Sequence, residues 1–343
     1  MTITVLKPGA LSQLQDLGRY GCQRYGVVVG GAMDEWSHRV ANALVGNDED
    51  EATLEITLTG PNLRFDAPAR VAVCGADLSP RVDGAGGTQS LPHGRPVDIA
   101  AGSQLRFGSR VAGARAYLAV AGGFDVPKVL GSRSTFVRGG FGGLDGRALR
   151  KGDVLRLRAR SRSGAAAKSA PENAASARAA LTLSVPSSPV VVPPQAAPVH
   201  AAPPQAIRIV AGRHWDVFTA QARHLLLEAT FRIGAQSDRM GYRLEGPELA
   251  RARPIEMISE AVTFGTVQVP PDGKPIILMA DRQTTGGYPK IASVASVDLG
   301  LLAQMASPEA VRFVLVTLVD AQRLYVARER EYSELRQALE GRE

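Results

Sequence analysis

Short apolar segments bounded by turn residues dominate the hydrophobic pattern of the chain. Segment 154–160, Val-Leu-Arg-Leu-Arg-Ala-Arg, alternates between apolar and basic positions, which is the period of a strand with one buried face. Other segments rich in β-branched residues are predicted strands as well: 71–73, 103–107, 116–120, 207–210, 267–269, 276–279 and 312–319. Because strands and helices do not alternate in the βαβ manner, we expect a mainly β fold with barrels or sandwiches and no parallel sheet.

Three helices interrupt this β pattern. Asp34 can cap a helix over 35–45, which carries an apolar stripe. Asp216 can cap a helix that ends at Leu227. Asp320 can cap a final helix of about five turns that is rich in paired charges.

A stretch of Ala, Pro, Ser and Arg at 161–206 divides the chain. It has too little apolar surface to offset the entropy of ordering, so we predict a disordered Ala/Pro-rich linker. On either side lie an N-terminal β-barrel half, 1–160, and a C-terminal β-barrel half with a C-terminal helix, 207–343.

The two halves share an order of motifs. Glu55-Ile-Thr-Leu-Thr-Gly60 matches Glu260-Ala-Val-Thr-Phe-Gly265, and each is followed by an apolar run that ends at an acid, 73–77 and 278–281. The agreement in order and spacing indicates an internal duplication.

Charge and composition exclude several classes of protein. The net charge is +7, but segment 128–162 alone carries ten Lys/Arg against Asp145 and Asp153, so the excess is confined to one region. Aromatic residues are only 5% of the chain, which leaves little material for base stacking, so we expect no nucleic-acid binding. No apolar run is long enough for a membrane span, no signal peptide is recognised, and only two cysteines are present. We therefore expect a cytoplasmic protein without membrane contact.

Common catalytic motifs are missing. The sequence has no phosphate-binding loop, no dinucleotide fingerprint, no metal-ligand spacing of His or Cys, and no nucleophile elbow. The Gly-Gly-Phe-Gly-Gly stretch at 139–143 is better interpreted as a turn than as a nucleotide cradle. Carboxylates, arginines and hydroxyls are left to carry any chemistry.

Such groups are dense in three stretches, which read SDRMGYRLEGP at 237–247, DRQTTGGYPK at 281–290 and GSRST at 131–135. Arg offers a planar fork to a carboxylate or phosphate, and Gly lets backbone N–H groups approach a ligand. Asp238 and Asp281 each adjoin an Arg. Either carboxylate could act as a base or could orient the guanidinium.

These stretches resemble a known family. GGAMDEWSHRVANALVGN (30–47), LEITLTGPNLRF (54–65), VLGSRSTF (129–136), SDRMGYRLEGP and ADRQTTGGYPKIASV (280–294) are similar to the C subunit of bacterial ATP-dependent 5-oxoprolinase. That family is also described as biotin-dependent carboxyltransferase-like, as allophanate hydrolase subunit 2, and as the antagonist of the sporulation-kinase inhibitor Kip. The likeness runs from residue 3 to about 330 without the linker, and it implies two tandem cyclophilin-like β-barrels per chain.

The resemblance also implies site residues. The catalytic candidates are Asp238, Arg239, Asp281, Arg282, Thr284 and Thr285, and the candidates for substrate or nucleotide binding are Asn42, Arg133, Ser134, Thr135, Glu260, Gln268, Gln283, Gly286, Gly287, Tyr288 and Lys290. Further motif positions are Asp16, Arg19, Met33, Asp34, Asn47 and Tyr242. No metal site is expected in the chain itself.

A hypothetical mechanism assigns roles to some of these groups. Asp281 would act as base, Arg239 or Arg282 would hold the substrate carboxylate, and Arg133 or Lys290 would offset phosphate charge. Because the motifs lie in both halves, we expect the site at their junction.

The resemblance implies ATP-dependent opening of 5-oxo-L-proline to L-glutamate. ATP with Mg²⁺ would bind at a site shared with a partner, and the partners would be a Kip-inhibitor-like B subunit and a lactam-utilisation-like A subunit. One alternative is a carboxyltransferase that moves carboxyl from biotin, carried on another protein, to a urea-like amide. Another is a non-catalytic binder that antagonises a kinase inhibitor.

Overall fold

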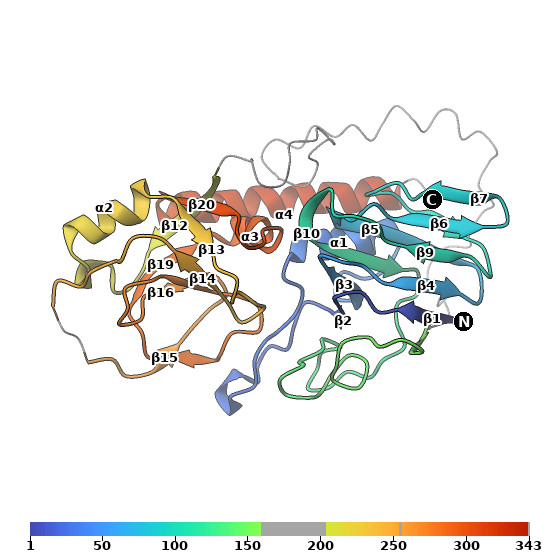
Figure 1. Ribbon diagram of the computed structural model, residues 1–343, viewed down its shortest axis with the longest axis horizontal. Helices are drawn as coiled ribbons and strands as arrows, with labels where there is room; N and C mark the ends of the chain where they lie inside the picture. The colour runs from blue at the N-terminus through green and yellow to red at the C-terminus, as the bar shows by residue number, and fades with distance from the viewer. Residues whose placement is uncertain (159–203, 254–255, 342–343) are drawn as a thin grey trace.

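The computed structural model describes residues 1–158, 204–253 and 256–341, and it is mainly β, as predicted (Figure 1). Most of the predicted linker lies outside the described residues. The two halves lie side by side, and one long helix runs along both (Figure 1).

In the first half the strands form two sheets. The six-stranded sheet has the order β11-β1-β4-β9-β6-β7, and the five-stranded sheet has the order β2-β3-β10-β5-β8. Their bounds are β1 Thr2–Lys7, β2 Leu11–Gln15, β3 Thr53–Thr57, β4 Asn62–Phe65, β5 Ala69–Asp77, β6 Arg81–Gly84, β7 Gly87–Ser90, β8 Val97–Ile99, β9 Gln104–Arg106, β10 Ala112–Val120 and β11 Val154–Arg156. Alternate apolar residues such as Ile3, Val5, Leu63 and Phe65 are fully buried and pack in one core.

In the second half seven strands form a closed barrel, in the order β12-β19-β16-β17-β14-β13-β20. The bounds are β12 Gln205–Ala211, β13 Phe231–Ile233, β14 Gly241–Glu245, β16 Thr266–Gln268, β17 Ile276–Leu278, β19 Lys290–Val294 and β20 Ala310–Leu315. A two-stranded sheet of β15, Glu260–Ala261, and β18, Thr285–Gly286, lies outside it. Pairing is antiparallel among the described strands except between β12 and β20, which are parallel.

The helices are α1 Glu35–Leu44, α2 Ala220–Glu228, α3 Leu299–Ala303 and α4 Leu318–Glu340, with 3₁₀ turns η1 Gln23–Tyr25, η3 Trp215–Val217 and η4 Ser296–Asp298. The predicted cap of α1 is confirmed, because the Asp34 side chain accepts a hydrogen bond from the Ser37 N–H. No described helix combines the length and the apolarity that crossing a lipid bilayer requires.

Two predicted caps are wrong. Asp216 lies inside η3, and the chain is extended at Phe218, so α2 begins later with Thr219 as its cap. Helix α4 is capped by Thr317, whose hydroxyl accepts from the Asp320 N–H and donates to the Asp320 carboxylate. Within the apolar segment 312–319, the strand ends at Leu315 and this reciprocal cap follows it. Helix α4 has 23 residues and is longer than predicted.

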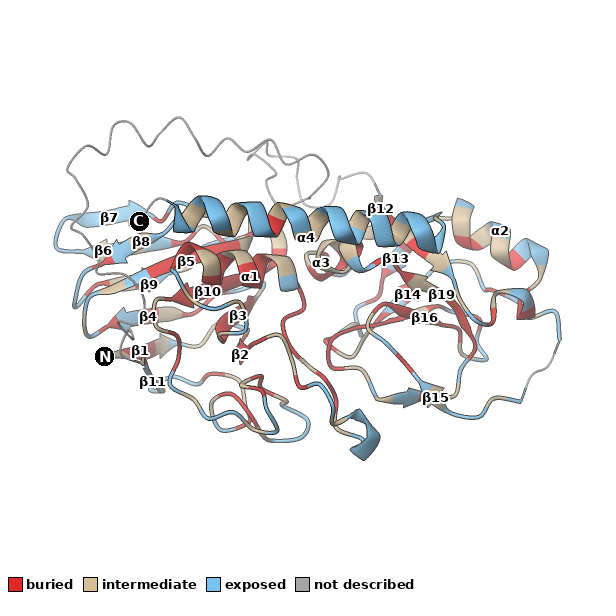
Figure 2. Cartoon of the chain, turned by 180° about the vertical axis from the view of Figure 1, so that it is seen from behind, coloured by how far each residue is buried: buried red, intermediate tan, exposed pale blue. Residues whose placement is uncertain are grey.

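Helix α4 holds the two halves together from one side. Most of its surface is exposed (Figure 2), but Tyr332 is buried against α1, where its ring packs edge-on to Trp36 and under the guanidinium of Arg39. Arg39 also donates two hydrogen bonds of 2.9 Å to Glu329. The C-terminal helix of the second half is thereby fixed to the first half.

Candidate functional site

A buried arginine occupies the junction between the halves. Arg239, just before β14, donates to both carboxylate oxygens of Asp281, from Nε at 2.8 Å and from Nη2 at 3.0 Å. Its Nη1 forms an ion pair with Glu55 of β3, and its Nη2 donates to the Gly31 carbonyl at 2.7 Å. Two polar stretches distant in the sequence therefore meet a third group, Glu55, between the two halves.

Glu55 is fully buried and every contact holds it as a carboxylate. It accepts hydrogen bonds of 2.9 Å from the Met33 N–H and from the Tyr117 hydroxyl. Burial by itself would raise the pKa of Glu55, but the charges of Arg239 and Arg115 and these two hydrogen bonds keep that pKa below its ordinary value. Burial opposes the charge of Arg239, but the carboxylates of Asp281 and Glu55 raise the pKa of that guanidinium.

A second bridge links the halves through Gln304, which follows α3. Its side-chain Nε2 donates to Asp34 at 2.7 Å and to the Arg115 carbonyl at 2.9 Å, and its Oε1 accepts from the backbone of 114 and 115. Arg115 in turn donates to the Tyr242 hydroxyl at 2.7 Å and the Ala303 carbonyl at 2.6 Å. The junction is thus a continuous buried polar network.

The predicted GSRST stretch is anchored to a first-half carboxylate. Asp16 accepts from the hydroxyls of Ser132, at 2.7 Å, and Ser134, at 2.6 Å, and from the backbone N–H of Arg133 and Gly18. Burial opposes ionisation, but these four donors lower the pKa of Asp16. The Thr135 hydroxyl donates to the Leu14 carbonyl at 2.9 Å. The hydroxyls of Ser134 and Thr135 are therefore engaged within the fold.

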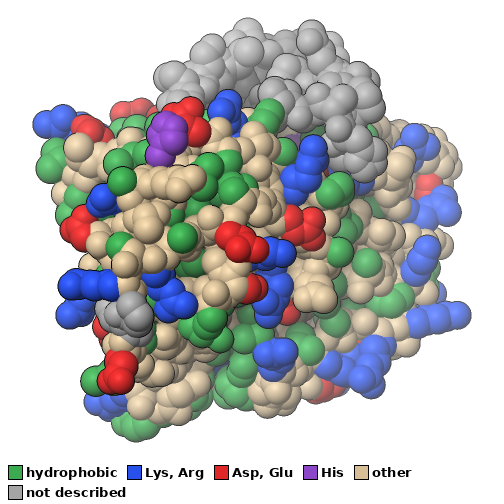
Figure 3. Space-filling model, turned by 60° about the vertical axis from the view of Figure 1, so that its left-hand side comes forward, with side chains coloured by type: hydrophobic (Ala, Val, Ile, Leu, Met, Phe, Trp, Pro, Cys, Tyr) green, Lys and Arg blue, Asp and Glu red, His purple; other side chains and the backbone are tan. Residues whose placement is uncertain are grey.

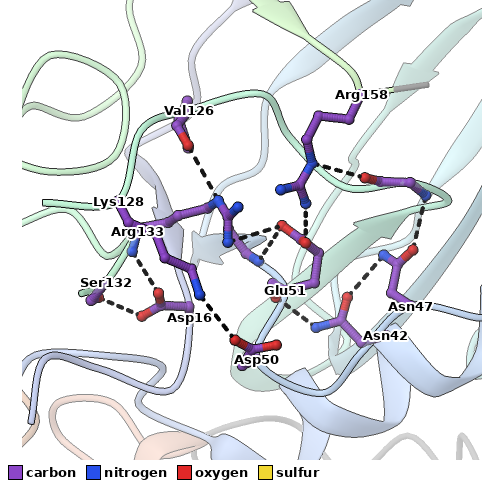
Figure 4. Close-up of polar contacts among 12 residues, drawn as sticks. Asp16, Asn42, Asn47, Asp50, Glu51, Val126, Lys128, Ser132, Arg133 and Arg158 are labelled. Carbon is purple, nitrogen blue, oxygen red and sulfur yellow. Dashed lines mark hydrogen bonds and ion pairs between the residues drawn. The ribbon is translucent and has the colours of Figure 1, made fainter. Parts of the chain in front are cut away.

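The side chains of Arg133 and Asn42 lie in another network, which surrounds Glu51 (Figure 4). The Arg133 guanidinium donates to the Val126 carbonyl at 3.2 Å and lies 3.9 Å from Glu51. Asn42, inside α1, donates to the Glu51 carbonyl at 2.7 Å. The Arg133 guanidinium is thus engaged within the first half, and its hydrogen bonds among the described residues do not reach Arg239 or Asp281.

A second cluster, which we call the lysine cluster, consists of Lys290, Gln268, Glu260, His214 and Gly286. Lys290 opens β19 and is 8% exposed, and its Nζ lies 3.5 Å from Glu260 Oε2. Within the described residues, neither Lys290 Nζ nor the amide Nε2 of Gln268, which is 2% exposed, has a hydrogen-bond partner. Two buried N–H donors without partners suit the oxygen of a small ligand, because they are costly when left unsatisfied.

Gly286 makes this arrangement possible. A Cβ at Gly286 would lie 2.4 Å from Gln268 Nε2 and 3.1 Å from Gln283 Nε2. Strand β18 pairs Gly286 with Glu260 of β15. A side chain at 286 would displace the Gln268 amide, so the glycine keeps these donors close to the backbone.

The remaining predicted residues belong to the 237–247 and 281–290 stretches. Arg282 is half-buried, and its guanidinium donates to the Ala280 and Val262 carbonyls at 3.3 and 3.5 Å and lies 5.9 Å from the centre of the Phe264 ring. Asp238 is exposed, and its carboxylate caps the turn at Met240 and Gly241. Four others line the 281–290 segment as half-buried or exposed positions, namely Thr284, Thr285, Gly287 and Tyr288.

Several site residues were missed from the sequence. Glu55 appeared only as the start of a repeated motif, and Tyr117, Arg115 and Gln304 lie outside every motif because their role depends on long-range contacts. His214 belongs to a set of histidines without ligand spacing. Four of the ten basic residues of segment 128–162 pair with acids, namely Lys128, Arg133, Arg147 and Arg158. On the face that carries the barrel, basic and acidic side chains are interspersed (Figure 3).

No group of three His, Cys, Asp or Glu side chains in the described part of the chain is arranged to hold a metal ion. Three of the four glycines at 139–143 are packed, namely Gly139, Gly142 and Gly143, whereas a Cβ at Gly140 would meet open space. A Cβ at Gly142 would lie 2.1 Å from the Ser134 carbonyl oxygen, and one at Gly143 would lie 1.9 Å from Thr135 Oγ1. This loop is thus a packed turn.

Comparison with known proteins gives a consistent result. Residues 25–315 match the family described as carboxyltransferase domain, subdomain A and B. The chain is 34% identical to the C subunit of 5-oxoprolinase from Haemophilus influenzae, over 94% of each chain, and 33% identical to that of Escherichia coli, over 97% of each. It is also similar to the crystal structure of Kluyveromyces lactis urea amidolyase, with a TM-score of 0.80 and 31% identity over 97% of this chain and 20% of that one.

Proposed function

The chain belongs to the carboxyltransferase domain A and B family, and from this premise we propose that it is the C subunit of an ATP-dependent 5-oxoprolinase. It would open 5-oxo-L-proline to L-glutamate together with A and B subunits. Support comes from length: the relatives named as C subunits of 5-oxoprolinase are matched along nearly their whole chains, whereas urea amidolyase is matched along a minor part.

One observation carries the proposal, namely that Lys290 Nζ and Gln268 Nε2 lack hydrogen-bond partners among the described residues. Transfer of a phosphoryl group brings negative charge to the lactam oxygen, and fixed N–H donors in a buried site stabilise that charge. We assign these two donors to the lactam oxygen. Glu260, at the exposed edge of the lysine cluster, would balance the charge of Lys290 before substrate binds.

The Arg239–Asp281 pair would act mainly as an orienting unit. Both oxygens of Asp281 accept from Arg239, and Arg239 is further committed to Glu55 and Gly31. Of the two arginines considered for the substrate carboxylate, Arg282 has the guanidinium with the weaker internal contacts. We therefore assign the carboxylate to Arg282, and we assign to Asp281 the placement of the 281–290 segment.

ATP would be a co-substrate whose γ-phosphoryl group transfers to the lactam oxygen with release of ADP. Water would then add to the ring carbon and the C–N bond would break to give an acyl phosphate, which a second water hydrolyses to L-glutamate and phosphate. The glycine loop at 139–143, where Gly139, Gly142 and Gly143 are packed, does not favour a phosphate cradle, and the described ranges hold no group of three His, Cys, Asp or Glu side chains arranged for a metal ion. We accordingly assign the triphosphate and its Mg²⁺ to a boundary with a partner subunit.

The test is phosphate release by the chain co-purified with its A and B partners, with 5-oxoproline, with urea and a biotinylated carrier protein, or with no substrate. We expect stimulation by 5-oxoproline only. Lys290→Met should lower that stimulated rate about 10²- to 10³-fold, the cost of losing an oxyanion donor. Lys274→Met, at an exposed turn of the same half, is the matched control and should retain the rate.

The carboxyltransferase alternative has its own support, since the match to the Kluyveromyces lactis urea carboxylase structure covers 97% of this chain with a TM-score of 0.80. Stimulation only with urea and a biotinylated protein would favour it. A complex that forms normally but shows no stimulation by either substrate would favour the non-catalytic binder.

A further inference from the structure

His214 lies directly behind Lys290. It follows β12, is 9% exposed, and makes two backbone contacts to the lysine. The His214 N–H donates to the Lys290 carbonyl at 3.0 Å, and the Lys290 N–H donates to the His214 ring Nδ1 at 3.2 Å. His214 is thus hydrogen-bonded to both the C=O and the N–H of Lys290, the residue that carries the buried amine.

This geometry determines which ring nitrogen carries the proton. Because Nδ1 accepts the Lys290 N–H, a neutral ring must carry its proton on Nε2. Nε2 lies 3.9 Å from Glu260 Oε1, and the other oxygen of that carboxylate lies 3.5 Å from Lys290 Nζ and 3.6 Å from Arg213. One ring nitrogen therefore faces the Lys290 backbone, and the other faces Glu260, the counter-ion of the lysine.

We propose that His214 is a positioning residue for Lys290, which holds the start of β19 through Nδ1 and orients Glu260 through Nε2, and that it does so only as the neutral ring. The inference rests on the proposed function for its catalytic consequence, although the placement of Lys290 is independent of the reaction. Protonation of Nδ1 would turn the acceptor into a donor facing the Lys290 N–H, so the hydrogen bond between the two would be lost in acid.

The charged groups around the ring agree with this. Burial lowers the pKa of His214, the charges of Lys290 and Arg213 lower it further, and Glu260 opposes them. Since the pKa lies below the ordinary value of about 6.5, the ring is neutral at neutral pH. The hydrogen bond from the Lys290 N–H to Nδ1 is then intact at neutral pH and is lost as the pH falls.

Two variants, each of which matches the position of one ring nitrogen, separate the roles of the two nitrogens. His214→Asn keeps an acceptor near the Nδ1 position without a group that titrates, and His214→Gln keeps a polar group near the Nε2 position only. In the intact chain, acetylation of Lys290 relative to exposed Lys274 would be measured by mass spectrometry between about pH 5 and about pH 8. The ratio cancels the intrinsic effect of pH on amine reactivity.

In the unsubstituted protein the Lys290/Lys274 ratio should be low at neutral pH and rise several-fold in acid. It should stay low and flat in His214→Asn, and it should be raised at every pH in His214→Gln. The stimulated phosphate release of the complex should fall about 10-fold or more in kcat for His214→Gln, with a smaller change in KM, and should fall less in His214→Asn, which keeps the acceptor for the Lys290 N–H.

A ratio that still rises in acid in His214→Asn, or is unchanged in His214→Gln, would overturn the inference. If His214→Gln does not fold, the pH response of His214→Asn decides alone. Failure of the proposed function would abolish phosphate release in all forms but leave the labelling ratios as expected, so the two failures are distinguishable.

Discussion

Arg239 in the second half and Glu55 in the first half form a buried ion pair, and the guanidinium that contacts Glu55 also holds Asp281. The position of Asp281 therefore depends on a carboxylate that comes from the other half of the molecule. Neither charge has access to water that would replace a lost partner, which makes the pair sensitive to removal of one side.

Glu55→Ala should lower the free energy of unfolding by about 3–5 kcal/mol, because it leaves the Arg239 charge buried with one counter-ion fewer. Urea-induced unfolding would measure the change. Glu334→Ala, at an exposed position of α4, is the control and should change stability by less than about 0.5 kcal/mol. A loss in Glu55→Ala no larger than in the control would contradict the role given to the pair.

Asp281→Asn should remove most of the 5-oxoproline-dependent phosphate release without dissociating the assembled enzyme. Asn retains one acceptor but places an amide N–H₂ against the Arg239 guanidinium, so the 281–290 segment loses its anchor. Activity assays together with size-exclusion chromatography would check this. Asp272→Asn, in an exposed turn, should behave like the unsubstituted protein, and full activity in Asp281→Asn would refute the assignment.

His38 predicts a loss of stability in acid. The ring is fully buried between the Thr53 hydroxyl and the Glu49 carbonyl, and burial lowers its pKa from 6.5 to about 4. Between these values the unfolded chain binds a proton that the folded chain does not, so stability falls as pH decreases through this window. The loss should reach about 3 kcal/mol by about pH 4.

The measurement is denaturant unfolding at several pH values. His38→Gln should remove this part of the pH dependence, at the cost of lower stability at neutral pH. His224→Gln, which alters a more accessible histidine of α2, should leave the slope unchanged. An unaltered slope in His38→Gln would exclude His38 as its source.

Glu329→Gln should loosen helix α4 from the first half. The variant removes the charge that pairs with Arg39, and because Glu329 is partly exposed we expect a loss of about 1–2 kcal/mol. Amide hydrogen exchange in the C-terminal half of α4 should quicken about tenfold. The matched variant Glu340→Gln, which breaks an exposed pair with Arg336, should leave exchange near Tyr332 unchanged, and equal effects of both would argue against α4 as the link between the halves.

The polar stretches identified in the sequence differ in whether their contacts are made with nearby or with distant residues of the chain. The 281–290 stretch carries Asp281, Gly286 and Lys290 in the order in which the chain passes from β17 through β18 to β19. The 131–135 stretch has a different setting, because its two serine hydroxyls bind Asp16, a residue more than a hundred positions away. Sequence spacing does not reveal whether a hydroxyl faces a ligand or another part of the chain.

Local patterns indicated part of the strands, the cap of α1 and the mainly β fold, because alternation and capping depend on residues a few positions apart. Tertiary structure decided which polar groups are satisfied. Closing the barrel left the donors of Lys290 and Gln268 without partners among the described residues, and docking the halves joined Glu55 to Arg239. Burial and long-range contacts set both outcomes, and no local pattern in the sequence encodes them.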